Sequence, residues 1–321
     1  MVRFTKKSWL VAVVALGLVV GAACKKAGDT AGGSSTGDDL SLIPADSEMV
    51  IGLNFAQLQQ SALWKQYAPK LMDKMSGKLA EFKTACGFDP MEAFKSMTMG
   101  MKNLSGGKPD GVVVIHGPEK ARLMACMEKY KSEAAKEGNE VTVDGDVVLV
   151  KDRNGQPSAF TFVSDTTMIG VIGANATKDG LAAAAKGGST LKTSQAFVDM
   201  YSKINTKDSL WVLVNGNSGL LDKASSVGVK PKAAFGSLNV TDGLALDARV
   251  RLGSADEATS LVSLLKSQTD NPQVKGMFDK LDVSADGVDA HVSVAMSNQK
   301  LQALAGMLGG VAGMMGGAGA P

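Results

Sequence analysis

The sequence is poor in the residues from which most catalytic and metal sites are built. Its 321 residues include two histidines and three cysteines. It contains no HExxH and no CxxC pair, so no zinc or redox motif can be assigned. Phosphate-binding loops are missing, and no Gly-x-Ser-x-Gly elbow comes with the supporting signals of a triad. We therefore predict no catalytic residue, no metal site and no cofactor, and expect a protein that is not an enzyme.

The chain also lacks an excess of charge of one sign. It carries 34 Lys and Arg side chains against 32 Asp and Glu, and 45% of its residues are hydrophobic. A dedicated nucleic-acid-binding protein needs a basic surface for phosphate contacts, and a disordered chain is poorer in apolar residues. The composition indicates a globular protein with no nucleic-acid partner.

The hydrophobic run at the N-terminus is too short to cross a bilayer. Residues 1–8 carry three basic side chains and no acidic one, and Trp9–Val20 is an unbroken apolar run of 12 residues. A membrane span needs about 20 apolar residues. A basic start, a short apolar run and small residues after it are typical of a secretory signal peptide. We predict a signal peptide over residues 1–23.

Cys24 directly follows the small residues Gly21-Ala22-Ala23. This order resembles the lipobox of bacterial lipoproteins, in which the Cys sulfur receives a diacylglyceryl group. Gly21 stands where that pattern usually has Leu, and the same small residues also suit an ordinary signal peptidase. Lipidation is favoured because a Gly/Ser-rich stretch follows, and such stretches behave as flexible coil. We predict a lipidated flexible tether over residues 24–42 and the membrane as a partner through that lipid. Lys25 after the Cys, by resemblance to enteric sorting rules, points to the outer membrane.

Beyond the tether, the periodicity of apolar residues predicts an α+β fold. The segments Leu244–Leu252 and Val288–Met296 alternate apolar and polar side chains, and helical stripes occur between such strands. One apolar and one polar face is typical of an antiparallel sheet with helices on one side. A long helical region is predicted over residues 58–85, kinked or divided at Pro69.

The order of elements recurs along the chain, which predicts two duplicated halves. Each half reads strand, helix, hairpin, helix, hairpin. Two Asp-Gly turns correspond between the halves: Asp110-Gly111 with Asp242-Gly243, and Asp144-Gly145 with Asp286-Gly287. We place the first α+β half at residues 43–205 and the second at residues 206–305. Residues 306–321 contain seven glycines and no charge, and we expect them to be a mobile Gly/Met-rich apolar tail.

The polar face of the last long strands carries titratable side chains. They are Asp247, Arg249, Arg251, Asp289 and His291. Such a face suits either a polar protein contact or water, and we expect it to be solvated, so that substitutions there change stability little. The other histidine, His116, lies at the end of a strand, where a loop-edge position is the ordinary interpretation.

The sulfur-containing residues have structural interpretations. Met97, Met99 and Met101 share one strand face, and although thioethers can bind Cu(I), methionine more often fills irregular core space. Cys86 and Cys126 each lie on the apolar stripe of a predicted helix, so both could be buried free thiols. Outside the cytoplasm a pair left over after lipidation is more often bridged, and we predict a structural disulfide between them.

The start of the mature chain resembles a recurring bacterial pattern. It consists of Ile43-Pro44-Ala45-Asp46-Ser47, the strand Val50–Asn54, Leu58 with Ser61-Ala62-Leu63-Trp64, and Cys86-Gly87-Phe88-Asp89-Pro90. These segments resemble a loosely defined group of uncharacterised bacterial envelope lipoproteins. The resemblance implies an envelope location and carries no activity. Two hypotheses stay open: a lipid-anchored, non-catalytic protein whose domain binds an envelope protein or an apolar ligand, and an enzyme whose site is not visible as a motif.

Overall fold

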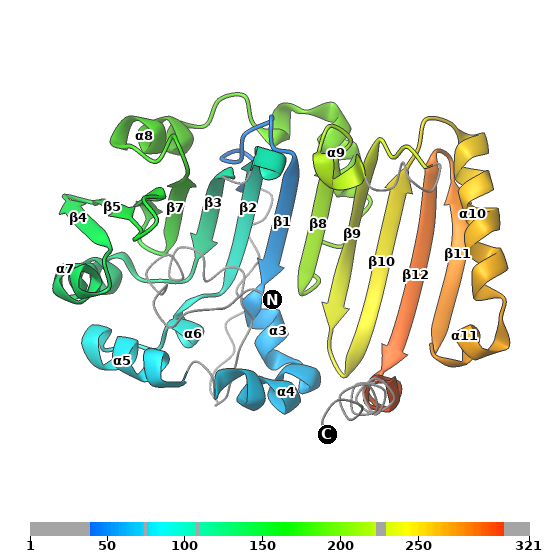
Figure 1. The fold of residues 1–321 in the computed structure, drawn as a ribbon, viewed down its shortest axis with the longest axis horizontal. Coiled ribbons are helices and arrows are strands. Elements are labelled where there is room, and N and C mark those ends of the chain that lie inside the picture. The colour runs from blue at the N-terminus through cyan, green and yellow to red at the C-terminus, as the bar shows by residue number, and fades with distance from the viewer. Residues whose placement is uncertain (1–38, 74–75, 107–108, 223–228, 305–321) are drawn as a thin grey trace, which may run out of the picture.

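The computed structural model describes residues 39–304, apart from residues 74–75, 107–108 and 223–228. The predicted signal peptide, Cys24, most of the predicted tether and the predicted tail lie outside the described residues. Within them, twelve strands form one antiparallel sheet (Figure 1). No helix of this part is long and apolar enough to cross a membrane. The α+β class predicted from the sequence is confirmed.

The elements of each half follow in chain order. The first half contains β1 (Met49–Asn54), α3 (Phe55–Gln60), α4 (Ala62–Met72), α5 (Ser76–Cys86), α6 (Pro90–Ala93), β2 (Ser96–Lys102), η2 (Leu104–Gly106), β3 (Asp110–His116), α7 (Lys120–Lys136), β4 (Glu140–Asp144), β5 (Val147–Lys151), β6 (Pro157–Ser164), β7 (Thr167–Ile172), α8 (Lys178–Lys186), η3 (Leu191–Thr193) and α9 (Gln195–Ser202). The second contains β8 (Leu210–Asn215), β9 (Ala233–Val240), β10 (Gly243–Arg251), α10 (Ala255–Thr269), α11 (Pro272–Gly276), β11 (Lys280–Asp286), β12 (Asp289–Ser297) and a helix over residues 298–304.

The predicted helical region 58–85 is three helices. The first break falls at Ser61, whose extended backbone ends α3 and whose hydroxyl accepts a hydrogen bond from the Trp64 N–H to cap α4. Pro69 lies inside α4 and does not divide the region. The division therefore follows the capping residue, which the helical stripe alone did not reveal.

The two halves share one sheet because β1 and β8 pair with each other. The strand order is β11-β12-β10-β9-β8-β1-β2-β3-β7-β6-β5-β4. From the β1–β8 junction, each half continues outward through two further strands in sequence, and a helix, α7 or α10, then leads to the later strands. Strand β12 lies next to β10 as β7 lies next to β3. The Asp144-Gly145 turn joins β4 and β5 at one edge of the sheet, and Asp286-Gly287 joins β11 and β12 at the other edge. The two hairpins differ in their neighbours, because β12 lies next to β10 whereas β7 and β6 separate β5 from β3.

Gly52 of β1 makes the junction close. It pairs with Trp211 of β8, and a Cβ at position 52 would collide with the indole ring. Trp211 is fully buried on the face of the sheet that α8 and α9 cover, next to the Tyr201 ring. Glycine is therefore required at this position by close approach of a large side chain.

Helices pack on both faces of the first half. On the face that carries Met99 and Val113, which we call the α10 face, α3 to α7 enclose a core. On the opposite face, which we call the α9 face, Leu181 of α8 and Phe197 of α9 pack against Trp211 and its neighbours. The sequence predicted helices on one side of the sheet. That prediction holds at β11 and β12, where α10 packs on the α10 face.

The folded domain begins before residue 43. Asp39 and Leu40 are buried, and Leu40 packs in the same core as Ile43. One Asp39 oxygen accepts a hydrogen bond from the Thr98 hydroxyl at 2.7 Å, and the other lies 2.8 Å from His116 Nε2. Residues 39–42 thus belong to the domain and not to the predicted tether. Sequence reasoning missed this because both partners of Asp39 are distant in the chain.

The sulfur residues take their predicted structural roles. Met97 and Met99 are buried in the core under α3 to α7. Cys86, the last residue of α5, is bonded to Cys126 of α7 with the two Cα atoms 4.7 Å apart. The predicted disulfide is confirmed, and it joins the two helices over the sheet.

The disulfide predicts a measurable loss of stability when it is removed. It closes a loop with a sequence separation of 40 residues, for which the chain-entropy model gives about 4 kcal/mol. The Cys86→Ser/Cys126→Ser variant should lose stabilisation of that order in urea unfolding. Addition of a reductant should lower the unfolding midpoint of the wild type and leave that of the variant unchanged. Two thiols that react with iodoacetamide in the unreduced, unfolded wild type would contradict the bond.

Candidate functional site

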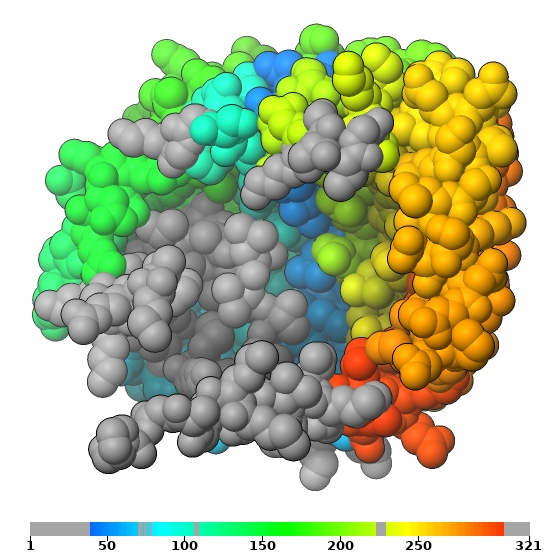
Figure 2. Space-filling view, turned by 45° about the vertical axis from the view of Figure 1, so that its right-hand side comes forward, coloured from blue at the N-terminus to red at the C-terminus, as the bar shows by residue number. Residues whose placement is uncertain are grey.

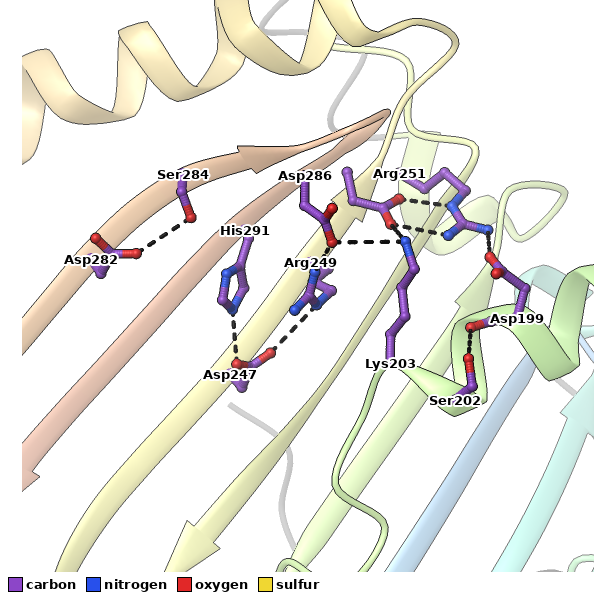
Figure 3. Close-up of polar contacts among 11 residues, drawn as sticks. Asp199, Ser202, Lys203, Asp247, Arg249, Arg251, Asp282, Ser284, Asp286 and His291 are labelled. Carbon is purple, nitrogen blue, oxygen red and sulfur yellow. Dashed lines mark hydrogen bonds and ion pairs between the residues drawn. The ribbon is translucent and has the colours of Figure 1, made fainter.

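The charged side chains of β10 and β12 form a closed ion-pair cluster on the α9 face (Figure 3). At its centre Asp289 has no exposed side-chain surface. Arg251 donates from Nε and Nη2 to the two Asp289 oxygens at 2.7 and 3.0 Å, and Lys203 donates to one of them at 2.7 Å. Burial alone would raise the pKa of Asp289, but the hydrogen bonds from Arg251 and Lys203 outweigh it and hold the pKa below its ordinary value.

The remaining members of the cluster are also paired. Arg249 donates to Asp286 at 2.8 Å, and His291 Nε2 lies 2.8 Å from an oxygen of Asp247. Arg251 also contacts Asp199 of α9. The prediction of a solvated face was therefore wrong. Two partners, Asp199 and Lys203, come from the α9 region, and the strand pattern could not show that they fold over β10.

This cluster has the chemistry of a structural element. Each cation in it faces at least one carboxylate, so the charges are compensated within the protein. Among the described residues, no group of three or more His, Cys, Asp or Glu side chains could hold a metal ion. A buried carboxylate that stays charged favours only the conformation in which both of its cations contact it, because any other leaves a buried charge unpaired.

The cluster predicts that Arg251→Ala is far more harmful than an ordinary surface substitution. It leaves the fully buried Asp289 with Lys203 as its remaining cation, and removal of one partner from a buried pair costs about 3 kcal/mol or more. The matched control is Lys136→Ala, which removes an exposed pair with Glu133 on α7. Urea unfolding should show a clear loss for Arg251→Ala and no change for the control. Equal midpoints for both variants would contradict a structural role.

His116 belongs to a second polar row on the same face. Its Nε2 contacts Asp39, and its Nδ1 lies 3.2 Å from the Thr167 hydroxyl on the neighbouring strand. Carboxylate, imidazole and hydroxyl follow in the order of an acyl-transfer triad, but the ring is turned the other way, because Nε2 faces the carboxylate and Nδ1 the hydroxyl. Asp39 is also held by Thr98, and the row fixes the point where the chain enters the domain. His116 is the last residue of β3, as the sequence predicted, and its contact with Asp39 adds an anchoring role that a loop-edge position did not suggest.

The opposite, α10 face of β8 to β12 presents a continuous aliphatic surface. Cross-strand pairing aligns Leu238, Leu246 and Val294 in one row, and Val212, Gly236, Ala248 and Val292 in the next. Small residues at the centre of the second row lower the floor between larger neighbours. We call this surface the aliphatic trough and define it by six residues: Val212, Gly236, Leu238, Leu246, Ala248 and Val294.

The trough lies between the two cores of this face. Among the described residues, the core under α3 to α7 reaches Leu53 and Val240, and the core under α10 begins at Leu281 and Val292. The trough residues belong to neither, and Leu246 has 40% of its surface exposed. Figure 2 shows a hollow on this side, with α10 along one wall and atoms of β1 and β8 to β10 at its floor. Around Leu246, Val212, Leu238, Ala248 and Val294 are half-buried and Gly236 is buried. Apolar surface that stays partly exposed across several strands marks a candidate binding site.

The sequence predicted the aliphatic face but not its exposure. The alternation of Leu244, Leu246, Ala248 and Val250 with charged residues predicts that these four side chains face a core. The sequence feature that could have revealed this exposure is the number of helices. Between β8 and β12 the described chain has one long helix, α10, to cover five strands. This helix covers β11 and β12, and no other helix among the described residues packs over the middle of β9 and β10 on this face.

Comparison of this chain with protein-family models, curated proteins and solved structures finds no match.

Proposed function

We propose that this protein is a lipid-anchored, non-catalytic protein of the cell envelope whose folded domain holds an elongated apolar ligand in the aliphatic trough. The acyl chain of a lipid is the ligand class that fits. The observation that carries the proposal is the uncharged, partly exposed surface around Leu246, which runs across neighbouring strands between the core under α3 to α7 and the core under α10. A soluble domain that exposes such a surface has a thermodynamic reason to cover it.

The chemistry of the floor favours a hydrocarbon over a polar ligand. The backbone N–H and C=O groups of β8, β9, β10 and β12 are used in the sheet, and the trough side chains carry no polar atom. A polar ligand would lose its hydrogen bonds to water without replacement. Each CH2 group removed from water instead contributes about 0.8 kcal/mol. The binding free energy of an acyl chain therefore becomes more favourable with each CH2 group that lies on the floor.

The lipid anchor would keep the domain close to a source of such chains. Because Asp39 already belongs to the domain, the proposed tether is confined to residues 24–38. A flexible Gly/Ser-rich chain of this length has an end-to-end distance of about 20 Å. Stable attachment takes more than one acyl chain, which a diacylglyceryl group on Cys24 with an N-acyl chain would supply. Lys25 supports the outer membrane as the site of attachment.

Anchoring is tested by Cys24→Ser in the native envelope. The substitution removes the only lipid attachment point that the proposal invokes, so the protein should move from the membrane fraction to the soluble fraction. Ser34→Ala in the tether is the matched control and should stay in the membrane fraction. Fractionation with immunoblotting measures both. Membrane levels of the Cys24→Ser protein equal to those of wild type would contradict lipid anchoring.

Ligand binding is tested with the fluorescent fatty acid cis-parinaric acid. Leu246→Lys places a charge in the trough at a position exposed enough to tolerate it, and burying that charge under a hydrocarbon is unfavourable. We expect binding at least about tenfold weaker, which corresponds to about 1.4 kcal/mol. Val163→Lys is the control, because Val163 is similarly exposed but lies on β6, outside the trough.

The titration is made with the mature chain and with a chain that ends at Leu304. Weaker binding of Leu246→Lys together with unchanged binding of Val163→Lys supports the trough as the site. Absence of binding by both wild-type chains, or equal loss in the two variants, would contradict the proposed function.

A further inference from the structure

We propose that, when no ligand is bound, the aliphatic trough is covered by the chain's own segment 305–321. This occupant is independent of any external ligand, so the inference does not rest on the proposed function. Three observations carry it: the place from which the segment starts, its composition, and its length relative to the trough.

The segment starts at the rim of the trough. Helix 298–304 follows β12 without a loop, and Asn298 donates a hydrogen bond to Gln66 of α4 at 2.9 Å. Lys300 pairs with Asp279, at the other side of the same end of the sheet, at 3.2 Å. These contacts fix the helix at the lower right of the hollow in Figure 2, where it is drawn in red beside α11. The chain that follows residue 304 therefore leaves from that rim.

The composition of the segment matches that of the trough. Residues 305–321 contain no charged and no hydrogen-bonding side chain. In the helix before them, Leu301 and Leu304 are half-buried while Gln302 and Ala303 are exposed. Large apolar residues continue that stripe at intervals of three and four, at Leu308, Val311 and Met315. An uncharged segment with one apolar stripe is complementary to an uncharged aliphatic floor.

The segment is long enough to cover the trough. Strand β10 has nine residues and so extends about 30 Å. The 17 residues of segment 305–321 span about 25 Å as a helix and more when extended. Its seven glycines oppose a helix in water, so order in the segment would come from contact with the floor. A segment attached at the rim also acts at an effective concentration in the millimolar range, which favours it over a second copy of the chain.

The test is photocrosslinking from the floor of the trough without added ligand. Leu246 is replaced by the photoreactive amino acid p-benzoylphenylalanine in the otherwise unchanged mature chain, which is irradiated, reduced and digested with trypsin. The crosslinker then lies in the peptide Ala233–Arg249, and the proposed partner is the peptide Leu301–Pro321. We expect mass spectrometry to find these two peptides joined within one molecule as the main product. The same reagent at Val163 should not join to Leu301–Pro321.

Three outcomes would overturn the proposal. They are a crosslink from position 246 to the same region of a second copy, a main product with another peptide or a bound lipid, and an unreacted Leu301–Pro321 peptide after the reagent is consumed. If the Leu246 variant does not fold, Val294 takes the reagent, because it lies opposite Leu246 in the β10–β12 pair. Because no ligand is added, failure here leaves the cis-parinaric acid result intact, and the two proposals fail separately.

Discussion

The pairing of β1 with β8 is the contact on which the rest of the structure depends. It joins seven strands of the first half to five of the second in one antiparallel sheet. The pairing is close because Gly52 leaves room for the Trp211 ring, which is buried against α9 and the neighbouring strands. Through this junction the two faces of the sheet are continuous from one half to the other. Without it, the ion-pair cluster would lack Asp199 and Lys203 of the α9 region, and the trough would lack the neighbouring core under α3 to α7.

The two faces of the second half then carry opposite chemistry. On the α9 face, the buried Asp289 draws Arg251 and Lys203 together and ties the α9 region to β10 and β12. Those charges are paired with one another within the fold. On the α10 face, the same strands present Leu246 and its aliphatic neighbours to an open hollow. The polar face thus supports the sheet, and the apolar face is left for a contact that the described residues do not make.

Sequence reasoning predicted what depends on local pattern. Alternation in β10 and β12 assigned each side chain to the correct face, and the apolar stripes and the compartment argument predicted the Cys86–Cys126 bond. It failed where the partner is remote. Asp39 finds Thr98 and His116 across 59 and 77 residues, and Asp289 finds Lys203 across 86. The burial of these groups depends on tertiary contacts, and so does the exposure of Leu246, which requires knowing how far α10 reaches.

The central claim is that the trough is an apolar binding surface, and methyl NMR of the mature domain tests it most directly. With labelled Ile, Leu and Val methyl groups, titration with a fatty acid should shift the signals of Val212, Leu238, Leu246 and Val294 and give intermolecular NOEs from the acyl chain to them. The signals of Val113 and Val114, buried beneath the helices of the first half, should not move. Shifts confined to the α9 face, or no NOE to any trough methyl group at saturating ligand, would contradict the account.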